Sequence, residues 1–153
     1  MPYSTPKTNW EIRRTNTGAY AGDYLNASDY MRIVNNVAFL HDACQVIYRI
    51  TIPETSMTSH TVNDVPLAAD FNAIETNIQY ICEKTFFPDS WSSKKTFYAN
   101  GTAPGVDDWN RWERTIRAIK DRLDYDSQWI PFIDSDGLPF YTSDGAEFLV
   151  IGE

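Results

Sequence analysis

The chain is poor in the residues that build disulfide frameworks and metal centres. It has only two cysteines and two histidines in 153 residues, and no pair of them has the spacing of a zinc site. No apolar run approaches the roughly 18 residues that a bilayer requires, and the first residues lack the apolar stretch of a secretion signal. We therefore expect free buried thiols, no metal and no membrane span.

Positive charge is also scarce. Thirteen Lys and Arg stand against 21 Asp and Glu, which gives a net charge of -8. Nucleic-acid backbones and anionic membrane surfaces are bound through Lys and Arg, so the charge balance argues against both as partners. Aromatic residues, in contrast, are abundant, with five Trp, nine Tyr and eight Phe. So many rings in a small chain suggest surfaces that meet a partner protein.

An internal repeat organises the middle of the chain. Residues 29–37, 70–78 and 108–116 align without gaps, and each begins with Asp followed by an aromatic residue. Apolar residues recur in each at steps of three and four, which is the period of an α-helix facing a core. Polar positions also correspond, namely Asn72 with Asn110, Glu75 with Glu113, and Asn36 with Asn77.

The repeat predicts a mainly α fold with three amphipathic helices, at about 27–48, 67–85 and 106–124. Around them the chain divides into an extended N-terminal arm at 1–24, a three-helix repeat domain at 25–126 and a C-terminal element at 127–153. We expect the arm to become ordered on assembly, because it has no clear periodicity.

The C-terminal element is predicted to be a small antiparallel β structure. Two Asp-Gly pairs, at 136–137 and 144–145, stand between aromatic and β-branched runs. Such pairs are typical of tight turns between short strands.

No catalytic template is complete. His41 lies near the apolar stripe and is interpreted as a histidine at the edge of the core. Residues 134–137 begin like a calcium loop but lack its later ligands, so they are interpreted as a turn. Glu75 and Glu113 are interpreted as solvated or capping side chains rather than as a glycosidase pair. Phosphate-binding and nucleophile motifs are absent from the sequence, and we assign no catalytic, cofactor-binding or metal residue.

The connections at 49–66 and 86–105 are longer than usual between packed helices. Such loops either pack over the helices or dock on another chain, and their bulky aromatic residues favour docking. Trp109 and Trp112 lie on the helical stripe and are expected in the core. The interface candidates are aromatic residues of the arm, the second loop and the tail: Trp10, Trp91, Phe97, Tyr98, Trp129 and Phe148.

The repeated pattern Asp-aromatic-Asn-Arg-Ile-Glu-x-Asn-Ile resembles segments of small virion proteins that tailed bacteriophages and prophages encode in tail or baseplate clusters. It is fullest at residues 70–78 and 108–113, whereas the copy at 29–36 lacks the first Asn and the Glu. The lead-in at 22–27 is also similar. The resemblance names no enzyme and covers only three short blocks.

The resemblance implies a non-enzymatic structural subunit of a phage tail or baseplate, assembled in the host cytoplasm and located in the virion. Its partners would be other tail proteins, in a homo-oligomer or a hetero-assembly. The alternative is a carbohydrate- or cell-surface-binding module, in which Trp91, Phe97 and Tyr98 form a platform for a host surface glycan.

Overall fold

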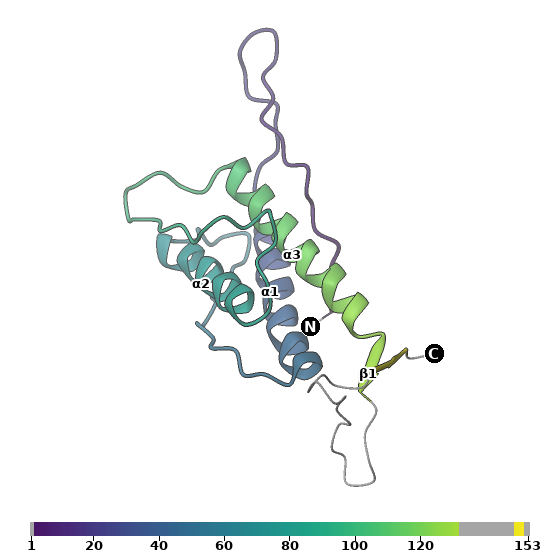
Figure 1. Cartoon of the computed structure of the whole chain (residues 1–153). Helices are drawn as coiled ribbons and strands as arrows, with labels where there is room; N and C mark the ends of the chain where they lie inside the picture. Colours follow the sequence, from purple (N-terminus) through teal and green to yellow (C-terminus); the bar gives the residue numbers. More distant parts are fainter. Residues whose placement is uncertain (1, 132–148, 152–153) are drawn as a thin grey trace.

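Three packed helices form the body of the chain, as the sequence predicts. The structure is a computed structural model that describes residues 2–131 and 149–151. The helices are α1 (Ala27–Tyr48), α2 (Ala68–Lys84) and α3 (Val106–Asp126). Helix α1 packs against both α2 and α3 (Figure 1). The mainly α fold class is therefore confirmed.

The aspartate that opens each repeat lies in the first turn of its helix. Asp70 accepts a hydrogen bond from the backbone N–H of Leu67 at 2.6 Å, and Asp108 accepts one from Gly105 at 3.1 Å. In α1 this task falls to Asn26, whose side chain accepts from the backbone N–H of Asp29 at 2.9 Å. These bonds satisfy N–H groups at helix ends, and the carboxylates also face the positive end of the helix dipole.

The apolar stripes of the three helices meet in one core. Trp112 is fully buried, as expected, and Trp109 is half-buried against the same core. The stripes contribute these buried side chains: Ile33, Val37 and Leu40 from α1, Ile74, Ile78 and Ile81 from α2, and Ile116, Ile119 and Leu123 from α3. The helical period read from the sequence is therefore the packing pattern of the fold.

Cys44 and Cys82 are both free and buried, which confirms the expectation from the sequence. Burial raises the pKa of the Cys44 thiol to about 11 and that of Cys82 to about 12. Because the thiolate is the reactive form, we expect neither thiol to react with a disulfide reagent in the folded chain at about pH 8. Both should react once denaturant unfolds it. A thiol modified equally fast with and without denaturant would contradict the structure.

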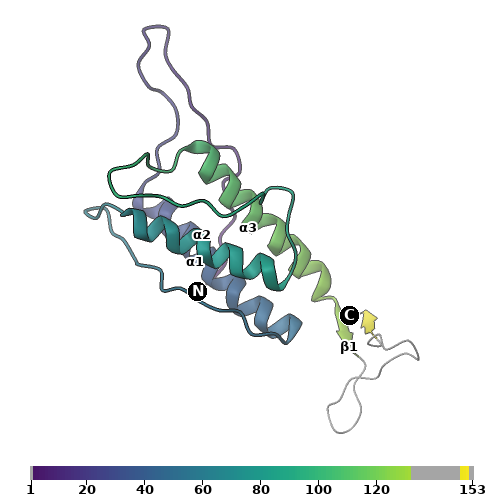
Figure 2. The same ribbon diagram turned by 60° about the vertical axis from the view of Figure 1, so that its left-hand side comes forward.

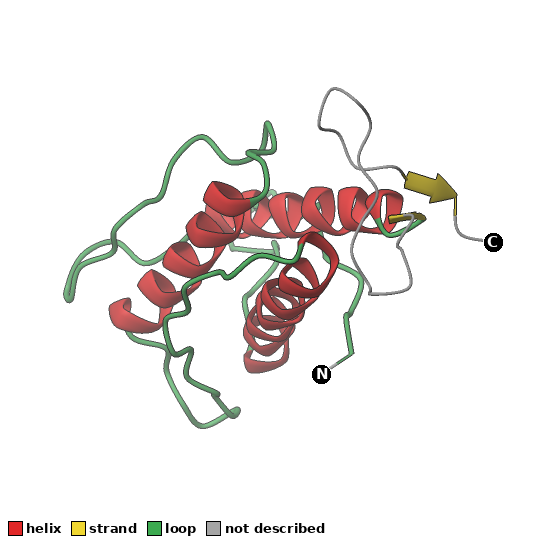
Figure 3. Cartoon of the chain, turned by 60° about the horizontal axis from the view of Figure 1, so that its bottom comes forward, coloured by secondary structure: helices red, strands yellow, loops and turns green. Residues whose placement is uncertain are grey.

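The long connections pack over the helices instead of standing away from them. Figures 2 and 3 show both loops running along the helical body. Ile52 of the first loop and Trp91 of the second are buried in the core. His41, at the edge of the core as expected, bonds the Ile52 carbonyl through Nε2 at 3.0 Å. Packing on the chain's own helices therefore replaces the docking that we favoured for these loops.

The N-terminal arm has two parts. Residues 2–10 lie against the helical body, where Pro6 and Trp10 are buried. Residues 11–24 form a hairpin that projects beyond the helices (Figure 1). Arg14 and Tyr20 pair as an antiparallel bridge within it. The first part therefore packs on the chain's own helices, whereas the expectation that the arm becomes ordered on assembly stays a prediction.

Two three-residue strands follow α3. They are β1 (Trp129–Pro131) and β2 (Leu149–Ile151), and they pair antiparallel with Ile130 opposite Val150. The two predicted turns and Phe148 lie outside the described residues. The C-terminal β element as a whole therefore stays a prediction.

Candidate functional site

Four asparagines fasten extended segments to the helices. Each side-chain amide accepts a hydrogen bond from the backbone N–H of one residue and donates one to the carbonyl of the same residue, as a neighbouring β-strand would. We call them the asparagine clips. The clips and the residues they hold are Asn36 with Ser4, Asn77 with Thr55, Asn72 with Phe97, and Asn110 with Trp10, all at 2.7–2.9 Å.

The clips occupy the third and eighth positions of the nine-residue repeat. Two of the six third and eighth positions do not carry Asn, and there other side chains bind the extended segment. At the third position of the first copy, the Met31 sulfur accepts from the backbone N–H of His60 at 3.3 Å. At the eighth position of the third copy, the Thr115 hydroxyl bonds that of Ser90 at 2.8 Å. All six positions therefore bind an extended segment.

The extended segments connect the helices in a cyclic order. Each runs from the eighth position of one helix to the third position of another. Residues 4–10 join α1 to α3, residues 55–60 join α2 to α1, and residues 90–97 join α3 to α2. The repeat thus describes three segment-and-helix units that the segments join in a ring.

Sequence reasoning missed the segments, although a signal for them exists. A triplet of Pro, any residue, and Ser or Thr stands at residues 2–4, 6–8, 53–55 and 88–90. In all of these except 6–8, the Ser or Thr is the residue bound at an eighth position. Because Pro favours extended backbone and donates no N–H, the triplet suits a segment that side chains must hold.

The ring at the second position of each repeat meets a ring of the bound segment. The pairs are Trp109 with Trp10, Tyr30 with His60, and Phe71 with Phe97, with ring centroids 5.1, 5.0 and 6.1 Å apart and edge-to-face angles of 67°, 72° and 65°. Edge-to-face pairs are a favourable aromatic arrangement. Trp10 and Phe97, two of the predicted interface residues, are therefore parts of the internal framework.

Burial separates the other interface candidates. Trp10 is 4% exposed and Trp91 is 3% exposed. The Trp91 ring donates through Nε1 to Gln79 at 2.8 Å and lies 4.5 Å from the guanidinium of Arg111. Tyr98, in contrast, is 73% exposed. The backbone of Trp129 forms part of β1, and its side chain, like Phe148, is outside the described part of the structure.

Glu75 and Glu113 are completely buried, so our interpretation of them as solvated or capping side chains is wrong. Glu113 Oε1 accepts from Arg32 Nε at 3.1 Å and from Nη2 at 2.5 Å. Glu75 accepts from the Arg111 guanidinium, from Trp112 Nε1 at 2.7 Å and from a backbone N–H at 2.9 Å. The carboxylates therefore cross-link helices inside the core.

Both buried ion pairs join the same two positions of the repeat. An arginine at the fourth position of one helix binds the glutamate at the sixth position of another. At the remaining fourth and sixth positions stand Ala73 and Val34, which are 6% and 5% exposed. The framework thus has two charged pairs and one apolar counterpart. Burial, only partly offset by Arg32, raises the pKa of Glu113 above its usual value.

An open hollow of about 430 Å³ lies where the three helices begin. We call it the aromatic hollow. The second-position rings of all three helices line it, together with aliphatic residues of the connecting segments: Tyr30, Phe71, Trp109, Leu25, Val62 and Val65. Asp64 also lines it. Its walls are mostly apolar, which suits an apolar side chain.

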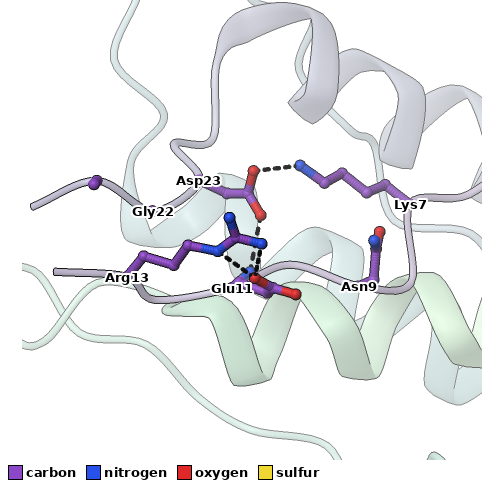
Figure 4. A pocket seen from close by; sticks show the side chains of 7 residues that line it. Lys7, Asn9, Glu11, Arg13, Gly22 and Asp23 are labelled. Carbon is purple, nitrogen blue, oxygen red and sulfur yellow. Dashed lines mark hydrogen bonds and ion pairs between the residues drawn. The ribbon is translucent and has the colours of Figure 1, made fainter. Parts of the chain in front are cut away.

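A smaller pocket at the base of the hairpin is lined by two ion pairs, Lys7 with Asp23 and Arg13 with Glu11 (Figure 4). Asp23 accepts from Lys7 Nζ at 2.6 Å and from the backbone N–H of Glu11 at 2.8 Å. The hydrogen bond from Lys7 lowers the pKa of Asp23. A Cβ at Gly22 would lie 2.5 Å from the Glu11 carbonyl oxygen, so this position requires glycine. These contacts hold the base of the hairpin in place.

The described residues contain no cluster of three His, Cys, Asp or Glu side chains that could hold a metal ion. Among them, none of the helices is both long and apolar enough to cross a membrane. No protein-family model matches the chain, and neither curated proteins nor solved structures gave a significant match.

Proposed function

We propose that the chain is a non-enzymatic structural subunit of a bacteriophage tail or baseplate that docks to other virion proteins. The observation that carries this proposal is the place of the repeat motif in the structure. The residues that resemble virion proteins are those that clip the extended segments and pair the helices. The motif therefore serves to build a rigid body.

Exposed apolar side chains support a docking role for that body. Several of them lie at the end where the helices begin, either on the hairpin or around the aromatic hollow. Their exposed fractions are 64% for Ile12, 68% for Tyr24, 87% for Val62, 79% for Val65 and 67% for Leu67. Apolar surface gathered in one region is typical of protein interaction sites.

A sugar platform built from Trp91, Phe97 and Tyr98 receives less support. Trp91 is buried and hydrogen-bonded, and Phe97 is half-buried against Phe71 and Trp112. A platform needs open aromatic faces, and only Tyr98 of the three is well exposed. We therefore propose no glycan site in the second loop.

Labelling of phage particles tests the proposed function. Antibodies raised against the purified chain should place gold at the tail or baseplate of particles released by prophage induction from a strain that carries the gene. Antibodies against a capsid protein provide the control and should label heads only. Purified particles in which mass spectrometry detects capsid and tail-tube proteins but not this chain would overturn the proposal.

A further inference from the structure

We propose that two copies of the chain dock by inserting the hairpin of each, residues 11–24, into the aromatic hollow of the other. This pairing goes beyond the proposed function, because it would form between isolated chains without any other virion protein. Three observations carry it: a hairpin that projects from the helical body, an apolar hollow and their place at the same end of the molecule.

The hairpin has features of a segment that binds a partner. A two-stranded hairpin alone is marginally stable in water, yet this one projects from the body (Figures 1 and 2). Four backbone hydrogen bonds hold its two sides together, from the N–H of Thr15 to the Ala19 carbonyl at 2.8 Å, and from Gly18 to Thr15, Ala21 to Arg13 and Asp23 to Glu11 at 2.9 Å. It exposes the apolar side chain of Ile12. A partner that covers this side chain would stabilise the hairpin.

The hairpin is also an addition to the repeat. After the residue held at a third position, the other two segments reach their helices through residues 61–67 and 98–105, about half the length of the stretch at 11–26 that follows Trp10. The first segment alone inserts a hairpin between Trp10 and Ala27. The clips of the first segment hold Ser4 and Trp10, so none of the asparagine clips involves residues 11–24. A role outside the framework therefore explains the insertion.

Charge and polarity match between the two surfaces. The aromatic hollow has mostly apolar walls, Asp64 is among the residues that line it, and Asp107 is exposed in the first turn of α3. The hairpin exposes Ile12 and carries two arginines, of which Arg13 is already paired with Glu11 at 2.5 Å, so that Arg14 is the cation left to face these carboxylates. The Arg14 guanidinium donates to the Gly18 carbonyl at 3.1 Å. Opposite charges around an apolar contact favour the intended register and speed association.

The position of the two surfaces permits reciprocal exchange. Leu25 and Ala27 line the hollow and directly follow the hairpin in the chain. Bonds between Lys7, Glu11 and Asp23 hold the hairpin base, so that it points past the helices (Figures 1 and 4). If two copies meet at this end and are related by a twofold axis, the hairpin of each copy reaches the hollow of the other. Such an assembly is closed as a dimer.

Sedimentation measures the pairing directly. The purified full chain should dimerise with rising concentration. Ile12→Ser on the hairpin and Val65→Ser in the hollow should each weaken dimerisation at least about tenfold, because each removes a buried aliphatic side chain from the contact. Val46→Ser is the matched control, since Val46 is 75% exposed but lies near the opposite end of α1. It should leave the dimer unchanged.

Cross-linking between copies identifies the surfaces. A mixture of Ile12→Cys and Val65→Cys chains, treated with a short bismaleimide, should give a covalent heterodimer. A mixture of Ile12→Cys and Val46→Cys chains should not. Cys44 and Cys82 are buried and should not react. All substituted positions are exposed, and circular dichroism verifies that each variant folds.

Two results would overturn the pairing. One is a wild-type chain that stays monomeric up to its solubility limit. The other is cross-linking of the Ile12→Cys and Val65→Cys mixture no stronger than that of the control mixture. If the pairing failed in this way but antibodies against the chain still labelled phage tails, the proposed function would stand without the pairing. The occupant of the hollow would then be a different virion protein.

Discussion

Replacing Arg32 with alanine should destabilise the chain by about 3–5 kcal/mol at neutral pH, because it leaves a buried carboxylate without its cation. Glu113 is completely buried, and Arg32 supplies two donors to its Oε1. Urea denaturation monitored by tryptophan fluorescence measures the loss. A destabilisation below about 1 kcal/mol, the size expected of an exposed pair, would contradict the buried arrangement.

The repeat supplies the control for this prediction. Ala73 and Val34 stand where the other units have their Arg and Glu, and both are buried. The double variant Arg32→Ala with Glu113→Val imitates that apolar counterpart. It should be more stable than Arg32→Ala alone, because the uncompensated charge is gone. Losses that simply add would contradict the coupling of the two side chains.

The pH dependence of the Arg32→Ala variant should also be distinctive. Burial raises the pKa of Glu113 in the folded chain above its unfolded value. The unfolded chain therefore holds fewer protons at this group, so its contribution to stability is present at acid pH and lost as pH rises through the folded pKa. The deficit of the variant should shrink as pH falls from neutral toward the usual carboxyl range. A deficit that grows with acid would contradict this sign.

Replacing Asn77 with alanine should cost about 2–4 kcal/mol, because it leaves the N–H and carbonyl of Thr55 without their partners. The Asn77 side chain is 1% exposed and also donates to the Ala73 carbonyl at 2.9 Å. Since the clip holds the loop at residues 49–66, the loss should be local as well as global. Limited proteolysis should cut the variant within this loop, and hydrogen exchange at the Thr55 amide should accelerate.

Asn35→Ala is the matched control for the clip. Asn35 adjoins the Asn36 clip on α1, but its buried Oδ1 makes no hydrogen bond. Its removal should therefore cost far less and leave the loop resistant to protease. Equal losses in the two variants would show that the clip geometry is not what stabilises the loop.

The helices and their inward faces could be predicted from the sequence because they depend on local order. The step of three and four in apolar residues defines a helical stripe, and each repeat carries that stripe together with an early Asp. The prediction that Trp112 is buried followed from the same stripe. The free buried thiols of Cys44 and Cys82 were expected on another ground, namely that two cysteines without a secretion signal do not form a disulfide framework.

The polar contacts could not be predicted, because they join residues far apart in the chain. Glu113 and Arg32 are 81 residues apart, and Asn110 and Trp10 are 100 apart. From the sequence alone, a polar side chain in a helix is predicted to be solvent-exposed. Only the tertiary structure shows whether a neighbouring helix or segment covers it. Trp10 and Trp91 illustrate the converse error, since rings in segments without periodicity suggested a surface and are buried instead.

The sequence by itself determined three helices, their apolar faces and a repeated set of polar positions. Only the tertiary structure decided that these positions clip extended segments and form buried ion pairs, since that depends on the relative rotation and height of the helices. Helix formation is governed by neighbours three and four residues away. The partner of a buried polar group is instead a residue distant in sequence that can complete its hydrogen bonds. A buried polar group without a hydrogen-bond partner lowers the stability of the fold.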